Sequence, residues 1–420
     1  MATTLTTPMP SPTSMAATAS TTGVAATKAT GARRASATAA GTPAPATAPT
    51  APPLSAAGVL DGANDRQQHG FLRTEGLLPS PRDVRVPAEL IRRHGLRRGD
   101  LVVGECDRAR TLTRIASVNG LPPGAVRGRP HFRDLTPLHP RHRMRLETPT
   151  GGLTPRIVDL LAPVGKGQRG LIAAPPKTGK TVLLQQLAAS FAENHPECRL
   201  MVVLIDERPE EVTDMRRRVR GEVLASTFDQ SPKEHIALAE LAVERAKRLV
   251  EQGQDVVILL DSLTRLCRAH NNATGPGSGG RTLSGGVDVA ALQGPKRFFG
   301  AARLTEEGGS LTILATALVE TGSRADDYFF EELKSTGNME LRLDRALAHR
   351  RLHPAVNVPL TGTRREELML PADELVALHQ LRRALHAGDG TVRTEALLER
   401  VRKTPDNATF LRQVRGTEPR

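Results

Sequence analysis

GLIAAPPKTGKTVLLQQLAASF, at residues 170–191, is the stretch that decides the fold. Its first five residues are apolar and of strand length, and from Val182 onward apolar residues recur at helical spacing. Between them, Ala174 to Thr181 follows the pattern of a phosphate-binding loop, with Ala174 where glycine is usual. Backbone N–H groups and the helix N-terminus of such a loop bind an anion. We therefore predict a strand–loop–helix unit that binds a nucleotide.

Two side chains of this loop have the chemistry for a triphosphate. Lys180 can reach the terminal phosphates, and the Thr181 hydroxyl can ligate Mg²⁺. Pro175 and Pro176 have no N–H group, so the backbone donors begin at Lys177.

The chain around this loop alternates helical and strand-like patterns, which indicates an α/β sheet. Continuous apolar runs of strand length, typical of parallel strands buried on both faces, occupy residues 199–205, 255–260 and 310–317. Residues 233–252 have apolar positions at helical spacing with charges opposite them. Two closing helices are expected at 375–386 and 391–401.

The amino-terminal part has a different texture. Residues 1 to about 60 are rich in Ala, Thr, Pro and Ser and contain no aromatic residue, so we expect a disordered arm. This composition also resembles an organellar transit peptide, although arginine is sparse. From Gly70 to about Val118, short alternating segments between Gly and Pro turns predict a small β-barrel with one helix at 87–95. Residues 121–143 are expected as a connector.

These textures predict three regions. Residues 1–63 are expected as the arm, 64–146 as the barrel with its connector, and 147–420 as the α/β domain with its closing helices.

Composition narrows the class of partner. The 420 residues carry a formal net charge of +13, which favours a nucleic acid over a plain solvated basic surface. The three cysteines are far apart in sequence and lack metal-ligand spacing, as expected of reduced thiols in a cytoplasmic protein. No run of about eighteen apolar residues occurs, so we expect no membrane span.

Two carboxylates follow apolar strands. Asp261 ends the run 256–260, where a carboxylate can reach Mg²⁺, although it could instead cap the next helix. Glu207 follows the run 199–205 and could orient and deprotonate the attacking water. The alternative for Glu207 is a charged helix start that suits the helix dipole.

Three arginines lie on loops. Arg281 in the Gly-rich segment 274–286 and Arg324 in a second short loop could contact a nucleic-acid backbone, or be plain surface residues. Arg364 could neutralise transition-state charge from a neighbouring subunit, or be an ordinary surface arginine.

Taken together these segments resemble the family of bacterial transcription termination factors called Rho, whose members are hexameric RNA-dependent ATPases with a RecA-type motor. The resemblance runs from about Gly70 to the C-terminus. It is carried by LAPVGKGQRGL at 161–171 leading into the phosphate loop, LIDERPEEV at 204–212, GEVLASTFD at 221–229, PKRFFGAAR at 295–303 and GNMEL at 337–341.

The resemblance implies a fold class and a set of site residues. The fold class is an α/β RecA-type P-loop ATPase domain preceded by an OB-like or cold-shock-like RNA-binding barrel and the disordered arm. It implies ATP and Mg²⁺ as cofactors, with Thr181 and Asp261 at the metal and Glu207, Lys180 and Arg364 as catalytic residues. Further nucleotide contacts are implied at Gly165, Lys166, Gly167, Gln168, Arg169, Gly170, Lys177, Thr178, Gly179, Lys180, Thr181, Val182, Arg208 and Arg351. Arg351 is implied beside Arg364, and Lys334 matches a family lysine near the active site.

For RNA, the resemblance implies contacts at Phe71, Arg73, Arg281 and Arg324. The barrel departs from the family at His69, Arg85 and Thr111, where aromatic residues usually stack RNA bases. His353 likewise stands where an aromatic residue is expected against the adenine ring. These departures predict a weakened or relaxed RNA site unless Arg and His compensate.

We therefore expect a cytoplasmic, ATP-driven RNA translocase that acts as a homo-hexamer on single-stranded RNA and the RNA polymerase transcription complex. A Rho-like RNA-binding regulator that has lost coupled hydrolysis is one alternative. A P-loop small-molecule kinase is another, and the basic charge, the barrel and the arginine loops argue against it.

Overall fold

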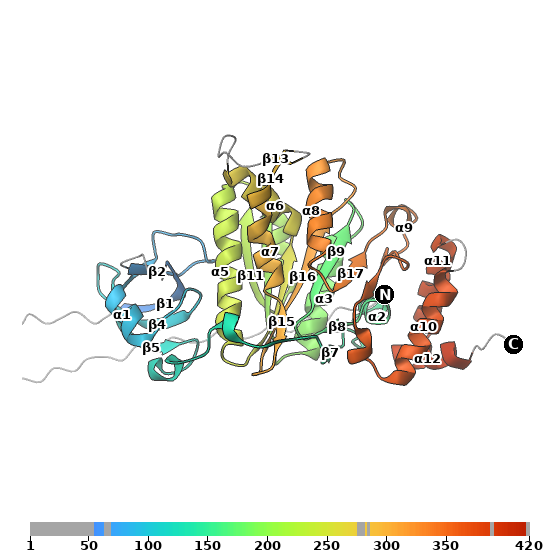
Figure 1. Cartoon of the computed structure of the whole chain (residues 1–420), viewed down its shortest axis with the longest axis horizontal. Coiled ribbons are helices and arrows are strands. Elements are labelled where there is room, and N and C mark those ends of the chain that lie inside the picture. The colour runs from blue at the N-terminus through green and yellow to red at the C-terminus, as the bar shows by residue number, and fades with distance from the viewer. Residues whose placement is uncertain (1–53, 63–68, 275–281, 284–285, 387–389, 417–420) are drawn as a thin grey trace, which may run out of the picture. The chain divides into compact units, whose positions relative to one another are not determined.

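The computed structural model describes residues 54–62, 69–274, 282–283, 286–386 and 390–416 (Figure 1). Residues 1–53 of the expected arm, and Arg281 of the Gly-rich segment, lie outside the described residues. No described helix is long and apolar enough to cross a membrane.

The first domain is a curled antiparallel sheet of five described strands in the order β3-β2-β1-β4-β5. A bridge between Arg85 and Thr111 joins its two edges. Alternate residues such as Leu72 and Val102 point inward and are fully buried. Its elements are β1 Leu54–Asp61, β2 His69–Arg73, β3 Val84–Pro87, α1 Ala88–His94, β4 Leu101–Cys106 and β5 Leu112–Val118. The expected barrel and its helix, which ends at the left-handed Gly95, are confirmed.

One expected boundary is wrong. Residues up to 63 were assigned to the arm, but β1 begins at Leu54 and pairs with both β2 and β4. Close packing at β1 requires small residues, so its sequence is rich in Ala and Gly and lacks the pattern that predicts a strand. A Cβ added to Gly58 would lie 2.7 Å from the carbonyl oxygen of Arg73.

Short turns connect this sheet to the larger domain. They are η1 Pro123–Val126, η2 Phe132–Asp134, β6 Pro137–Leu138 and β7 Arg143–Met144. The expected connector thus contains only short elements.

The larger domain is a mostly parallel sheet whose central order is β11-β10-β12-β16-β9-β17-β18. Its strands are β8 Val164–Gly165, β9 Arg169–Ala174, β10 Arg199–Glu207, β11 Glu222–Thr227, β12 Asp255–Asp261, β13 Thr282–Leu283, β14 Val287–Asp288, β15 Arg303–Thr305, β16 Ser310–Leu318, β17 Met339–Arg342 and β18 Gly362–Thr363. Its helices are α2 Leu153–Leu161, α3 Lys180–Asn194, α4 Pro209–Arg218, α5 Pro232–Val250, α6 Leu263–Thr274, η3 Val289–Leu292, α7 Gln293–Gly300, α8 Arg324–Lys334, α9 Arg345–His349, η4 Glu366–Leu368, α10 Ala372–His386, α11 Gly390–Arg402 and α12 Asn407–Gly416.

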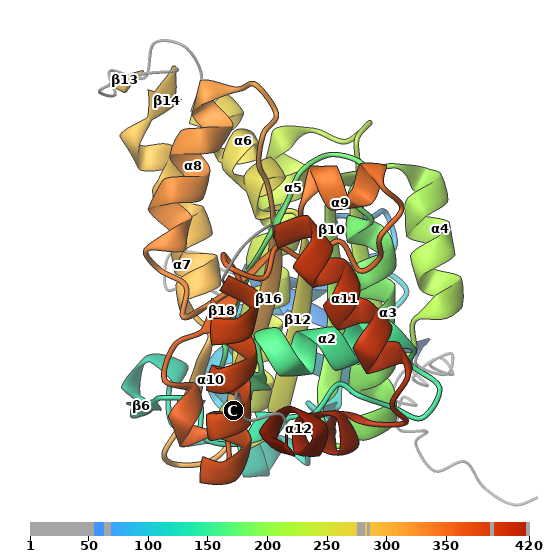
Figure 2. The same cartoon turned by 90° about the vertical axis from the view of Figure 1, so that its right-hand side faces the viewer.

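Helices cover both faces of this sheet. Along β10, Val202 and Leu204 face one apolar core with α2, α3 and the C-terminal helices, while Met201, Val203 and Ile205 face the other with α5 to α8 (Figure 2). This two-sided burial explains why the strand sequences are continuous apolar runs. The predicted strands at 199–205, 255–260 and 310–317 and the predicted helix at 233–252 are confirmed.

The parallel strands place the site. Because β9, β10 and β12 run in the same direction, the residues after their carboxyl ends meet at one edge of the sheet. The phosphate loop, Glu207 and Asp261 all lie at this edge.

Candidate active site

The phosphate loop joins β9 to α3. Lys177 and Gly179 both have positive φ angles, 66° and 90°, and the Thr178 hydroxyl donates to the carbonyl oxygen of Pro175 at 2.7 Å. These turns bring the chain to the helix start at Lys180, so the backbone donors lie where the sequence predicts an anion.

The Lys180 ammonium lies between two buried carboxylates. Its Nζ is 3.1 Å from Glu207 Oε1 and 2.5 Å from Asp261 Oδ1. Asp261 Oδ1 also accepts a hydrogen bond from the Thr316 hydroxyl at 2.8 Å. Asp261 therefore binds the lysine and Thr316 across the sheet edge, and its role toward Mg²⁺ stays a prediction. The side chains of Glu207 and Asp261 are only 3% and 2% exposed.

A bulge in β10 sets the direction of Glu207. The pairing with β11 shifts between Ile205 and Glu207, and Asp206 takes the left-handed conformation with φ 57°. Arg265 on α6 holds the bulge by donating to the backbone carbonyl oxygen of Asp206 and, at 3.0 Å, to its carboxylate. Sequence reasoning missed Arg265, because only the fold brings α6 to this strand end.

Burial and neighbouring charges shift the pKa values of Lys180 and Glu207. Burial raises the pKa of Glu207, and the neighbouring Lys180 opposes that shift. Burial disfavours the charged form of Lys180, but the carboxylates of Asp261 and Glu207 prevail and raise its pKa. A carboxylate with a raised pKa that ends a buried strand has the properties of a general base.

Oxygen ligands for Mg²⁺ are present. The Thr181 hydroxyl stands in the first turn of α3, 3.2 Å from Glu211 Oε2, and Asp261 ends β12. Hydroxyl and carboxylate oxygens are the ligands that Mg²⁺ prefers beside phosphates.

A cavity of about 400 Å³ lies on the other side of the phosphate loop. Val182, 57% exposed, and His353 lie among its lining residues, and His353 Nδ1 is 3.9 Å from where a Cβ on Gly179 would stand. A pocket of mostly apolar walls beside a phosphate loop suits a nucleotide base. Thr154, Gln186 and Leu343, which sequence reasoning missed, also line it.

Some predicted nucleotide residues lie elsewhere in the chain. Gly165 to Gly170 stand at the start of β9, and five residues of strand, roughly 16 Å, separate Arg169 from Ala174. Lys166 instead pairs with Asp255 at 2.7 Å and Glu197 at 3.2 Å. The extended strand therefore separates Gly165–Gly170 from the same chain's phosphate loop, and their contact with a nucleotide stays a prediction.

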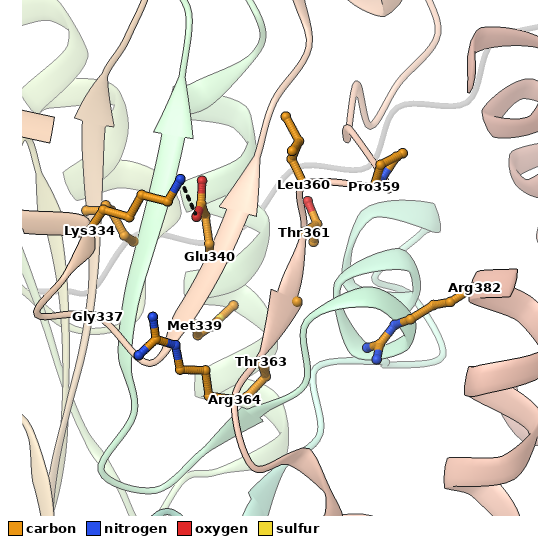
Figure 3. Close-up of a pocket in the computed structure, with 12 residues that line it drawn as sticks. Lys334, Gly337, Met339, Glu340, Pro359, Leu360, Thr361, Thr363, Arg364 and Arg382 are labelled. Carbon is orange, nitrogen blue, oxygen red and sulfur yellow. Dashed lines mark ion pairs between the residues drawn. The ribbon is translucent and has the colours of Figure 1, made fainter. Parts of the chain in front are cut away.

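Arg364 also lies at the start of β9. Its backbone N–H donates to Asn338, whose own N–H donates to the Arg169 carbonyl oxygen. With Lys334 and Glu340, Arg364 lines a pocket of about 330 Å³ beside β17 and the edge strand β18 (Figure 3). Arg364 therefore lies at the opposite end of β9 from its own phosphate loop.

Two other predicted arginines, Arg351 and Arg208, lie toward the edge of the sheet that carries the phosphate loop. Arg351 lies on the segment after α9, two residues before His353 and beyond the opposite end of β17 from Arg364. Its expected place beside Arg364 stays a prediction. Arg208 precedes α4, is exposed, and pairs with Glu211 at 3.2 Å.

The expected RNA residues of the first domain form one surface row. Phe71 pairs with Arg85, and Arg85 bridges to Thr111, so their side chains share the outer face. His69 meets the Phe71 ring edge-on at 5.2 Å. Arg73 lies 5.8 Å from the centre of the Phe71 ring while pairing with Asp61 and Asp83. Phe71, 37% exposed, is thus the one aromatic platform in this row.

Arg324 begins α8 and is exposed, at the same sheet edge as the end of β16. The Gly-rich segment that carries Arg281 ends near β14, and Arg281 itself stays a prediction.

Comparisons with known proteins agree with this architecture. The model of the ATP synthase alpha/beta family, nucleotide-binding domain, matches residues 154–361, and that of the Rho termination factor, RNA-binding domain, matches residues 56–124. A solved ATPase from the type III secretion system of pathogenic bacteria shares the fold, with a TM-score of 0.57 at 20% identity over 67% of this chain and 86% of that chain. Fold and site together define a RecA-type P-loop ATPase joined to an RNA-binding domain.

Relatives narrow this class to one family. The transcription termination factor Rho of Streptomyces coelicolor is 71% identical over 364 residues, which cover 87% of this chain and 86% of that protein. The Rho of Streptosporangium roseum is 59% identical over 364 residues, covering 86% of this chain and 93% of that protein. The chain belongs to the transcription termination factor Rho family.

Proposed function

We propose that this chain is an ATP-driven RNA translocase that binds nascent RNA and dissociates the transcription complex. The observation that carries the proposal is Lys180 held between Glu207 and Asp261 beside a phosphate loop, in a chain that also has an RNA-binding domain. Its partners are then single-stranded RNA, the RNA polymerase transcription complex and further copies of itself in a hexameric ring in the cytoplasm.

Each residue of the site has one task. Backbone N–H groups from Lys177 onward bind the phosphates, and Lys180 moves from the two carboxylates to the phosphates. That movement frees Glu207 to orient the attacking water and take its proton. Thr181 and Asp261 would hold Mg²⁺, which neutralises charge on the phosphates when bound.

The site is completed by a neighbouring copy. Arg364 lies at the far end of β9 from its own phosphate loop, so it can act as an arginine finger only toward another chain's phosphates. Lys334 lines the same pocket, about 330 Å³ in volume, and we assign it to the same phosphates. A head-to-tail contact of this kind builds a ring.

A Rho-like RNA-binding regulator with weak or lost ATPase coupling is the second candidate. The surface row of Phe71, Arg85 and Thr111 bears on it, because one aromatic platform stacks fewer bases than the several expected in this family, which weakens the RNA binding that would stimulate hydrolysis.

The test is ATP hydrolysis with poly(C), with poly(U) and without RNA, alongside the particle mass. We expect RNA-stimulated turnover by a hexamer and a loss of at least about 100-fold in Lys180→Ala and in Glu207→Gln. Lys403→Ala, which alters an exposed lysine paired with Glu399, is the control and keeps full turnover. RNA binding without turnover by the unaltered protein supports the regulator, and phosphate transferred to an acceptor other than water supports a kinase.

A further inference from the structure

Glu340 is a carboxylate in the pocket that carries the two cations we assign to the neighbouring site. It lies on β17 opposite Leu171 of β9, on the face covered by α8. Lys334 ends α8 and places its Nζ 3.7 Å from Glu340 Oε2, as the dashed line in Figure 3 marks. The Glu340 side chain is 21% exposed and that of Lys334 is 42% exposed.

The pair is held, but weakly. At 3.7 Å it is an ion pair without a hydrogen bond, and the other carboxylate oxygen, Glu340 Oε1, is buried without a hydrogen-bond partner. Arg342 approaches that oxygen at 3.9 Å. The Lys334 ammonium also lies 5.7 Å from the centre of the Phe330 ring. Lys334 therefore rests on Glu340 and Phe330, directed into its own pocket.

Arg364 differs from Lys334 in this pocket. Among the residues that the structure describes, the Arg364 side chain forms no hydrogen bond or ion pair, and only its backbone is tied, to Asn338. The guanidinium is thus ready for an incoming anion, whereas the ammonium must first leave a carboxylate.

The other phosphate-binding lysine is held in the same way. Lys180 is paired with Glu207 and Asp261, and Lys334 is paired with Glu340. Both lysines must exchange a carboxylate for a phosphate before catalysis.

We infer that Glu340 is a positioning residue that holds Lys334 back from the partner's nucleotide. Because Lys334 must leave the Glu340 carboxylate before it can bind a phosphate, this ion pair weakens ATP binding by each pair of subunits. This inference rests on the proposed function, because it requires a ring in which the pocket faces a second copy's phosphates. After Lys334 leaves, Arg342 remains beside the Glu340 carboxylate, so the free-energy cost of breaking the Lys334–Glu340 pair is smaller.

Glu340→Gln tests the inference, since glutamine keeps the shape and removes the charge. We expect the KM for ATP in RNA-stimulated hydrolysis to fall about two- to fivefold, with kcat changed less than about twofold. This fall in KM corresponds to the loss of a partly exposed ion pair, which contributes up to ~1 kcal/mol. A fluorescent non-hydrolysable ATP analogue bound to assembled rings should show the same gain in affinity.

Two further variants separate this role from a structural one. Glu332→Gln breaks the other lysine pair of α8, with Lys296 at 2.6 Å, outside the pocket, and should leave KM unchanged. In a Lys334→Gln background, Glu340→Gln should have no further effect on KM, because the lysine it restrains is gone. If Glu340→Gln does not assemble, Glu340→Asp, whose shorter side chain lengthens the 3.7 Å gap, should lower KM in its place.

The outcomes divide cleanly. An unchanged KM in Glu340→Gln, or an equal fall in the Lys334→Gln background, overturns the inference. A raised KM also overturns it, because Glu340 would then present Lys334 to the phosphate. Absence of RNA-stimulated hydrolysis in the unaltered protein contradicts the proposed function instead, whatever Glu340 does.

Discussion

Glu207 depends on Asp206 and Arg265 for its direction. The left-handed backbone at Asp206 turns the strand so that Glu207 faces Lys180, and the Arg265 guanidinium fixes both the carbonyl and the carboxylate of Asp206. A non-glycine residue in this conformation is strained and persists only where its surroundings hold it. Arg265 thus stabilises the bulge that directs the general base.

At the residue scale, Arg265→Ala should lower kcat by at least about tenfold with KM for ATP changed far less, because a base displaced by about 1 Å loses up to 100-fold in rate. Steady-state ATP hydrolysis at saturating RNA measures both constants. Arg268→Ala, which removes a neighbouring α6 arginine paired with Asp326 instead of Asp206, is the comparison. Equal losses of kcat in the two variants would contradict a specific role for Arg265.

The same residues show what sequence can predict about the site. Glu207 and Asp261 could be predicted, because each ends an apolar strand and parallel strands end at one edge. Arg265 could not, because it lies within a helix whose packing against β10 no local pattern encodes. Gly165–Gly170 were expected near the nucleotide from resemblance alone, and β9 keeps them away from the chain's own loop.

At the scale of elements, the strands with continuous apolar runs and the alternating strands of the first domain were predictable, whereas β17 and β1 were not. The sequence of β17, Met-Glu-Leu-Arg, alternates and is short, yet it pairs with β9 and bears Glu340. The strand β1 is hidden by its small residues, which the close approach of β2 demands.

Gly58→Val should therefore disrupt the first domain while the ATPase domain stays folded. Its Cβ would collide with the Arg73 carbonyl oxygen, and such overpacking costs about 1–3 kcal/mol. We expect RNA affinity to fall, with nucleotide binding retained. Ala57→Val on the exposed face of the same strand is the matched control. RNA and nucleotide titrations of both variants measure the effect, and equal RNA affinity in the two would contradict the packing argument.

At the scale of the whole molecule, we propose that no single chain holds a complete site. The phosphate loop and Arg364 lie beyond opposite ends of β9, so they belong to different active sites of the proposed ring. Each subunit then contributes its loop to one site and its arginine to the next.

Mixing two inactive variants tests this division. Lys180→Ala supplies an intact Arg364, and Arg364→Ala supplies an intact loop, so rings assembled from both should regain a measurable fraction of RNA-stimulated hydrolysis. Each variant alone should remain inactive at the same total concentration. Hydrolysis is measured after the subunits are dissociated, mixed and reassembled, and the absence of any recovery would place Arg364 in its own chain's site.

The ion pairs of Lys180 have a consequence for the order of binding. The Lys180 ammonium lies 2.5 Å from Asp261 and 3.1 Å from Glu207, so the carboxylate assigned to the metal already binds a cation. A divalent cation that arrived alone would have to compete with that ammonium for Asp261. A triphosphate that draws the ammonium to itself removes the competition, so metal and nucleotide are expected to arrive as one complex.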